Sequence, residues 1–182
     1  MTLWGHVPIS LEIGPCPRFR KTMKSPKIKT LDSLLKIRAR LRREGKTVVF
    51  TNGCFDLIHG GHVHLFRTAK KSGDILIVAL NTDASIRKNK GPSRPIFPLS
   101  ERFEVLAAFA DIDYLTAFPE PTPRAIIAAL RPDVLVKGGD WGTRAIVGRA
   151  EVEASGGEVV RVPYLKGHSS TNIIKKILKN FT

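Results

Sequence analysis

The chain has 182 residues, 42% of them hydrophobic, and carries a net charge of +14 at pH 7. This length and composition predict one domain with a hydrophobic core rather than two domains. No apolar run approaches the roughly 18 to 20 residues of a membrane span, and the first residues lack the pattern of a secretory signal. We therefore expect a soluble cytoplasmic protein that does not contact a membrane.

Basic residues are concentrated near the start of the chain. Residues 18 to 46 contain twelve Lys or Arg and two acids. Such a segment attracts anions of any kind, including nucleic acid and anionic lipid. Only Phe19 could stack on bases here, so we expect a solvated basic surface without sequence-specific nucleic-acid binding. A non-catalytic module that binds anions through this segment remains an alternative function.

The predicted elements follow in chain order. Residues 1–28 contain four prolines and no usable periodicity, which predicts a flexible extension, followed by a folded domain over 29–182. Near-helical spacing of leucines predicts a leading helix over 30–43, ended by Gly45. We then expect strands at 47–51, 75–80, 114–117, 134–136 and 159–162, and helices at 61–71, 100–109, 122–130, 143–154 and 170–180.

Short apolar strands that alternate with helices are typical of an α/β fold with a parallel, doubly wound, five-stranded sheet in a single domain. Ligands of such sheets bind beyond the carboxyl ends of the strands. The stretch 88–98 is rich in proline and basic residues, which predicts an irregular loop near that edge.

The segment TNGCFDLIHGGH, residues 51–62, joins the first strand of the core to the next helix. No G-x-G-x-x-G or P-loop motif is present, so a phosphate would have to be bound in another way. Gly60 and Gly61 allow a ligand to approach the start of a helix, where free N–H groups favour anions. His59 and His62 add imidazole donors that suit charge developing on phosphoryl oxygens.

Other roles remain open for these residues. A metal site made by His59, His62 and His64 is conceivable, although no carboxylate or thiolate pattern completes it. A second alternative is that the histidines are ordinary surface or core residues without a chemical role. Cys54 fits a packing role beside the turn, and both cysteines are expected to be reduced thiols, because Cys16 lies far from it in a different context.

The order of these motifs resembles the nucleotidylyltransferase superfamily, which has a Rossmann-like core. The likeness consists of N-G-x-F-D at 52–56, H-x-G-H at 59–62, VKGGDW at 136–141 and GHSSTNII at 167–174. Within the superfamily, the segments 50–56, 81–85, 93–95, 135–140 and 169–174 are similar to the adenylyltransferases that make ADP-heptose. These enzymes occur alone or as one domain of a bifunctional protein, and the chain resembles the stand-alone form.

The resemblance implies that AMP passes from ATP to a sugar 1-phosphate, heptose 1-phosphate, with release of pyrophosphate, in an enzyme that is commonly a homodimer. It implies that His59 and His62 are catalytic and contact the phosphates. The resemblance assigns nucleotide binding to Thr51, Asn52, Gly53, Cys54, Phe55, Gly61, Lys137, Gly139, Asp140, Ser169, Ser170 and Thr171. It assigns substrate binding to Asp56, Asn81, Asp83, Lys90 and Arg94. Mg²⁺ would be held mainly by phosphates and water, with Asp140 as a candidate ligand.

Several of these assignments have simpler alternatives. Lys90 and Arg94 can belong to a solvated loop, and the hydroxyls at 169–171 can simply cap the last helix. Cytidylyltransferases of the superfamily carry an R-T-E-G-I-S-T segment, whereas residues 164–170 read YLKGHSS and lack the Arg. This departure favours adenylyl transfer. Adenylyl or cytidylyl transfer to another acceptor, such as glycerol 3-phosphate or FMN, remains an alternative.

Overall fold

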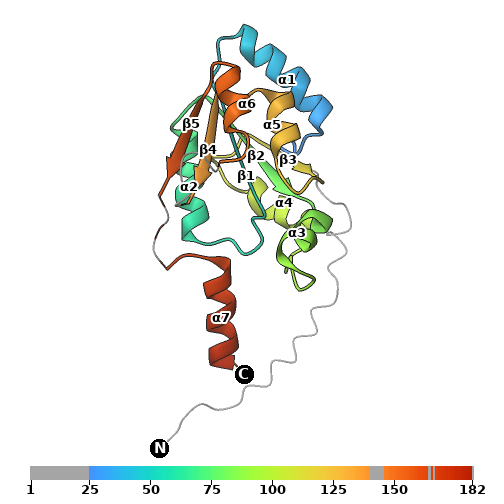
Figure 1. Ribbon diagram of the computed structural model, residues 1–182, viewed down its shortest axis with the longest axis vertical. Helices are drawn as coiled ribbons and strands as arrows, with labels where there is room; N and C mark the ends of the chain where they lie inside the picture. Colours follow the sequence, from blue (N-terminus) through green and yellow to red (C-terminus); the bar gives the residue numbers. More distant parts are fainter. Residues whose placement is uncertain (1–24, 140–145, 164, 166, 182) are drawn as a thin grey trace, which may run out of the picture.

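The computed structural model describes residues 25–139, 146–163, 165 and 167–181 (Figure 1). Five parallel strands form one sheet in the order β3-β2-β1-β4-β5. The strands are β1 (Val48–Gly53), β2 (Ile75–Asn81), β3 (Tyr114–Phe118), β4 (Val134–Gly138) and β5 (Glu158–Val162). All five were expected close to these positions, and the α/β class with a single parallel sheet is confirmed.

Helices cover both faces of the sheet, as Figure 1 shows. They are α1 (Leu31–Arg43), α2 (Gly60–Lys70), α3 (Asp83–Lys90), α4 (Leu99–Ala107), α5 (Arg124–Leu130), α6 (Arg149–Ala154) and α7 (Ser170–Phe181). Side chains from α2 and α4 pack in one core layer, and side chains from α1, α5 and α6 pack in the other. The sheet is therefore doubly wound.

The central strand, β1, contributes to both core layers. Val48 and Phe50 belong to the layer under α1, whereas Val49 belongs to the layer under α2, and all three are fully buried. Strands buried on both faces carry continuous apolar runs, which explains why this strand was recognisable in the sequence. The reversal of strand order lies between β1 and β4, so the loops after these two strands meet at the same edge.

The sheet begins before the leading helix. Ile28 forms a parallel bridge with Leu115 in β3, and the Lys29 N–H donates to the Leu115 carbonyl at 2.8 Å. The Leu115 N–H in turn donates to the Lys27 carbonyl at 2.8 Å. The domain boundary after residue 28 stays a prediction, and the structure adds that residues 27–29 are paired with the sheet.

Two helices differ from expectation. Residues 83–90 form α3, although residues 88–90 were assigned to an irregular loop; the Thr82 hydroxyl accepts a hydrogen bond from the Ser85 N–H and caps this helix. The helix expected from residue 143 begins at Arg149, because Gly148 has a φ of +95°, outside the helical region. Residues 143–145 lie outside the described residues.

The last helix, α7, projects away from the sheet in Figure 1. Its Ile177 and Leu178 side chains are about half exposed, at 49% and 55%. In the described parts of the chain, no helix combines the length and the apolar character that a membrane crossing requires.

Candidate functional site

The first feature of the site is the junction between β1 and α2, at the carboxyl end of the central strand. His59 has extended backbone angles, φ −146° and ψ 171°, and occupies the cap position of α2. Its carbonyl accepts from the N–H groups of His62 at 2.8 Å and Val63 at 3.3 Å, whereas its side chain makes no capping bond. The imidazole of His59 is thus available at a helix start, where the dipole favours anions.

The imidazoles of His59 and His62 stack on each other. Their centroids are 3.8 Å apart with 24° between the planes, and the Phe55 ring packs edge-on against His62 at 5.3 Å. The Nδ1 atoms of both histidines are buried and have no hydrogen-bond partner among the described residues. Because buried polar atoms are normally hydrogen-bonded, this pair of nitrogens indicates a place for a polar ligand.

Gly61 is needed for this arrangement. A Cβ atom at position 61 would lie 3.0 Å from both Cε1 and Nδ1 of His59, which is tighter than most real contacts, so the ring would have to shift. At Gly60 a Cβ atom would find ordinary contact, 3.4 Å from Cε1 of His168. The glycine pair therefore has unequal roles, and position 61 is the one that accommodates the His59 ring.

Both histidines are neutral near pH 7. Burial lowers the pKa of His62 to about 4, and the neighbouring His59 and Lys90 lower it in the same direction. Burial lowers the pKa of His59 as well, and His168 adds to the effect. Neutral imidazoles still donate one N–H each, and a bound phosphate would favour their protonation.

Lys137 comes from the neighbouring strand, β4. Its Nζ donates a hydrogen bond to Oδ1 of Asn52 at the end of β1, which joins the two strands where the sheet order reverses. Burial lowers the pKa of Lys137 to about 8, although Cys54 acts in the opposite direction. Gly139 follows with a φ of +129°, which L side chains rarely adopt, and its N–H donates to the Val162 carbonyl at 3.0 Å.

Asp56 anchors the loop that follows α3. It is almost fully buried and accepts from the N–H groups of Ile96 and Phe97 at 2.8–2.9 Å and from Nε of Arg94 at 2.7 Å. Burial on its own would raise the pKa of Asp56, but these hydrogen bonds outweigh it and the pKa is lowered. Arg94 and Asp56 were both expected at the substrate, and the structure brings them together as a pair.

Arg102, on α4, is a central residue that was not anticipated. Its guanidinium donates to the carbonyls of Cys54 at 2.6 Å, Asn81 at 3.0 Å and Phe97 at 3.1 Å. It also pairs with Asp83 at 2.7 Å. One buried side chain thus ties together the ends of β1 and β2, the loop and the start of α3. A positively charged side chain in the first turn of a helix is unfavourable with the helix dipole. This unusual position was the signal in the sequence that could have identified Arg102.

Asn81 and Lys90 lie at the two ends of the turn and helix after β2. Nδ2 of Asn81 donates to Oγ of Ser85 at 3.0 Å, and that hydroxyl donates to the Glu120 carbonyl at 2.8 Å. Asn81 is therefore engaged within the protein. Lys90 ends α3 near enough to His62 to lower its pKa.

The hydroxyls before α7 are also engaged. Oγ of Ser169 accepts from the Asn172 N–H at 3.0 Å, which is a helix cap, and Oγ of Ser170 donates to the Leu57 carbonyl at 3.2 Å. Thr171 is exposed. His168, which was not predicted as a site residue, lies 6.4 Å from His59 between ring centroids. Asp140 lies outside the described residues.

Thr51 and Gly53 complete the strand end. Thr51 is fully buried, and its hydroxyl has no partner in the described part of the chain. A Cβ atom at Gly53 would lie 3.1 Å from the Phe55 ring, and Phe55 itself has a φ of +46°. The backbone here is tightly turned, and the Phe55 ring lies beside Gly53 and edge-on against His62.

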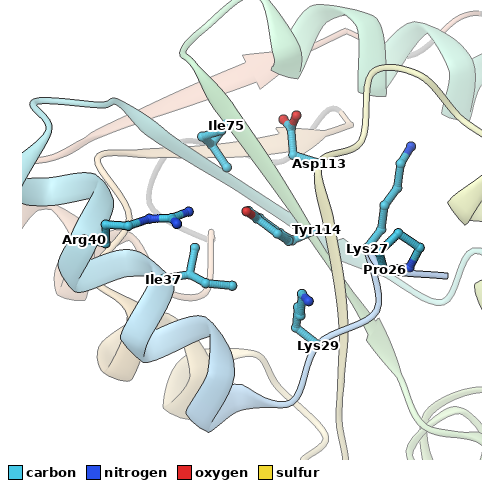
Figure 2. A pocket seen from close by; sticks show the side chains of 8 residues that line it. All are labelled: Pro26, Lys27, Lys29, Ile37, Arg40, Ile75, Asp113 and Tyr114. Carbon is cyan, nitrogen blue, oxygen red and sulfur yellow. The ribbon is translucent and has the colours of Figure 1, made fainter. Parts of the chain in front are cut away.

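Hollows are also present away from the histidines. Figure 2 shows one of about 550 Å³ at the amino ends of β2 and β3, the end of the sheet opposite to His59. It is lined by Pro26, Lys27, Lys29, Ile37, Arg40, Ile75, Asp113 and Tyr114. The volume of a hollow therefore does not locate the candidate site. The site is marked instead by the buried, unpartnered histidine nitrogens at the carboxyl ends of the strands. No group of three or more His, Cys, Asp or Glu that could hold a metal occurs among the described residues.

The fold, with the paired histidines at the β1–α2 junction, is that of a nucleotidyltransferase-type α/β domain. The model of the cytidylyltransferase-like family matches residues 50–176, and the chain belongs to this family.

Similar proteins include two named bifunctional protein HldE. The one from Geobacter sulfurreducens is 52% identical over 155 residues, and the one from Syntrophotalea carbinolica is 50% identical over 155 residues. Each match covers 85% of this chain and 32% of the relative. The chain thus spans about one third of the length of these relatives.

Two solved structures have the same fold. The lipopolysaccharide core biosynthesis protein from Thermoplasma volcanium aligns with a TM-score of 0.56 and 26% identity, over 68% of this chain and 100% of that one. Pantoate-beta-alanine ligase from Francisella tularensis aligns with a TM-score of 0.53 over 84% of this chain and 79% of that one. Its identity is 15%, so it supports the fold alone.

Proposed function

We propose that the protein transfers AMP from ATP to heptose 1-phosphate, releasing pyrophosphate and forming ADP-heptose for lipopolysaccharide or surface-glycan synthesis. The observation that carries the proposal is the stacked pair His59 and His62, whose buried Nδ1 atoms lack partners at the start of α2. The 52% identity to an HldE protein and the likeness to a lipopolysaccharide core biosynthesis protein support the choice of acceptor.

In this reaction an oxygen of the sugar phosphate attacks the α-phosphorus of ATP. A new P–O bond forms, the bond to the bridging oxygen of the β-phosphate breaks, and the electron pair leaves with pyrophosphate. No covalent intermediate with the protein is required, so catalysis consists of alignment and stabilisation of charge. The imidazole N–H groups of His59 and His62 would donate to the phosphoryl oxygens, and the dipole of α2 adds to their effect.

Nucleotide binding is assigned to the residues around the strand ends. Lys137 is close enough to β1 to bond Asn52, and its ammonium would offset phosphate charge. The buried hydroxyl of Thr51 and the tight turn at Gly53, Cys54 and Phe55, whose Phe55 ring packs against His62, are assigned to the nucleotide as well. Gly61, Gly139 and the start of α7 complete the set proposed for the nucleotide.

Acceptor binding is assigned to the edge formed by the loop after α3 and the end of β2. The carboxylates of Asp56 and Asp83 are already paired with Arg94 and Arg102, so their part would be to position these cations and the loop. Lys90, close to His62, is the cation best placed to reach a phosphate.

Mg²⁺ would be held mainly by phosphates and water, with Asp140, which lies outside the described residues, as a candidate ligand. The described residues hold no group of three or more His, Cys, Asp or Glu that could bind a metal on its own. When bound, it neutralises part of the triphosphate charge. A cytoplasmic location, where ATP is abundant, a homodimeric assembly and the absence of a nucleic-acid partner stay predictions.

A screen of pyrophosphate release tests the proposal. Purified protein is mixed with Mg²⁺, each of ATP and CTP, and each of heptose 1-phosphate, glycerol 3-phosphate and FMN. We expect release with ATP and heptose 1-phosphate, reduced by about a hundred-fold or more in His59→Ala and His62→Ala. His64→Ala, on the same helix, is the matched control and should retain activity. Release with CTP alone, or with another acceptor alone, would overturn the substrate assignment.

A further inference from the structure

A second hollow lies between α1 and α5, far from the histidines. It sits where α1 leads into β1 and α5 leads into β4, at the amino ends of these strands, whereas His59 follows the carboxyl end of β1. Its volume is about 350 Å³, and Figure 1 shows the two helices side by side. Four arginines line it, and none of the described residues that line it is acidic. We call it the arginine groove, after Arg38, Arg42, Arg43 and Arg131.

Arg38 is the fixed part of the arginine groove. Its side chain is 9% exposed and pairs with Asp133 at 2.7 Å, while Nε donates to the carbonyls of Leu130 at 3.3 Å and Arg131 at 3.2 Å. These bonds tie α1 to the end of α5, so the protein itself holds the two sides of the groove together. Nη1 of the same guanidinium is buried and has no hydrogen-bond partner among the described residues. Because buried polar atoms are normally hydrogen-bonded, this nitrogen indicates a place for an acceptor.

Arg131 has a backbone conformation that arginine rarely adopts. It ends α5 with φ +46° and ψ +63°, in the left-handed region where glycine is the usual residue. An arginine here carries a conformational cost, and residues held in such a conformation are often functional. The side chains of Arg42, Arg43 and Arg131 are exposed, and within the described part of the chain they have no ion-pair or hydrogen-bond partner. The groove is therefore lined by unpaired positive charges.

The chemistry of the lining indicates which anion fits. Guanidinium groups bind carboxylates and phosphates through two parallel hydrogen bonds. Leu35, which is 36% exposed, and the alanines Ala39 and Ala129 add apolar surface to the same groove. A phosphate backbone would gain little from this apolar surface, and no aromatic side chain lines the groove to stack on bases. A second copy of the chain, with its net charge of +14, would be repelled.

We propose that the arginine groove is the docking site for an acidic segment of a partner protein. Carboxylates of this segment pair with Arg42, Arg43 and Arg131, and its apolar side chains contact Leu35. The groove lies at the opposite end of the sheet from His59, so the inference does not depend on the proposed reaction. It gives a specific role to part of the basic stretch of residues 18 to 46.

Fluorescence anisotropy with a labelled peptide tests the chemistry of the groove at physiological ionic strength. The probe is a short peptide of alternating Glu-Glu and Leu-Leu pairs. Polyglutamate of the same length supplies the carboxylates without apolar side chains, and a single-stranded oligo-dT supplies phosphates. We expect the Glu/Leu peptide to bind about ten-fold more tightly than polyglutamate, because its leucines bury apolar surface, and more tightly than oligo-dT.

Two variants test the residues of the groove. Glycine suits the backbone at position 131, so Arg131→Gly should retain or raise the urea midpoint while the dissociation constant of the Glu/Leu peptide rises about five-fold or more. Arg42→Gln should weaken binding to a similar extent. Arg67→Gln is the matched control, because Arg67 is also in the last turn of a helix, α2, but does not line the groove. This control should bind the peptide as the wild type does.

The other outcomes each overturn the proposal. An equal loss of binding in Arg67→Gln would mean that the overall positive charge, rather than the groove, attracts the peptide. Equal affinity for polyglutamate would remove the apolar part of the recognition. Tighter binding of oligo-dT that is lost in Arg131→Gly and Arg42→Gln would make the groove a nucleic-acid site instead. A wild-type protein that does not bind the Glu/Leu peptide has no docking site of this kind.

Discussion

Arg102 and Asp83 form an ion pair of 2.7 Å although the arginine side chain is completely buried. The same guanidinium bonds three carbonyl oxygens, from Cys54, Asn81 and Phe97. It therefore connects the segments that follow two adjacent strands. None of these contacts gives it a part in the proposed reaction. Removing one partner of a buried charged network leaves the others unsatisfied, which is strongly destabilising.

We expect Arg102→Met to lower the free energy of unfolding by roughly 3 to 5 kcal/mol, measured by urea denaturation. Arg40→Met is the control, because Arg40 pairs with Glu44 on the surface at 3.6 Å and such pairs contribute at most about 1 kcal/mol. Similar losses for the two variants would show that Arg102 is not a structural clamp.

Gly61→Ala should reduce turnover without weakening the fold. The added methyl would meet the His59 ring at 3.0 Å and displace it, whereas alanine is the better helix former. We expect kcat/KM to fall by roughly ten- to hundred-fold, while the urea midpoint is retained or raised. Gly60→Ala, where contacts begin at 3.4 Å, should lose less activity. The reverse order of the two variants would contradict the packing described for His59.

Stability should fall as the pH falls from about 6.5 to about 4. The pKa of His62 is lowered from 6.5 to about 4 in the folded protein, so the unfolded chain binds more protons throughout that window. The stabilisation is complete above the unfolded pKa and is lost as the pH approaches the folded pKa, to the extent of about 3 kcal/mol for this group. Urea denaturation at pH 7.0 and 4.5 measures it, and His62→Gln should show a smaller difference between the two. If the variant shows the same difference in stability between the two pH values as the wild type, another group is responsible for the pH dependence.

The pH profile of catalysis should report Lys137. Its pKa of about 8 means that the ammonium loses its proton in mildly alkaline solution, which removes the charge that we propose offsets the phosphates. We expect kcat/KM for ATP to decline as the pH rises through about 8, and Lys137→Arg to remove this decline because guanidinium stays protonated. A wild-type profile that is flat between pH 7 and 9 would rule out this role.

The sheet was predictable because its strands are continuous apolar runs, and β1 with Val48, Val49 and Phe50 is the clearest case. The helix α3 was missed because only Ile86, among its eight residues, supplies a buried hydrophobic side chain, so no apolar period exists. The late start of α6 depends on the backbone of Gly148, whose conformation is set by neighbours rather than by its own preference.

The candidate site was partly predictable in the same sense. His59, His62 and Gly61 stand in one short segment, so their proximity follows from local sequence. Arg102 meets that segment across a separation of 48 residues, in its contact with Cys54. The loop that carries His168 meets it through Ser170, which contacts Leu57 across 113 residues. Contacts of this kind arise only when the strands have assembled. The partners of Asp56 likewise become visible only in three dimensions, and its role at the substrate stays a prediction.

The central place of β1 also has a consequence for local unfolding. β1 is hydrogen-bonded on both edges, whereas α7 projects from the body and is tied to the α2 segment by a side-chain bond at its first residue. Amide hydrogens of β1 should therefore exchange with solvent only through global unfolding, and those of α7 through fraying. The segment between β1 and α2 that carries His59 and His62 should therefore keep its structure in states in which α7 has already opened.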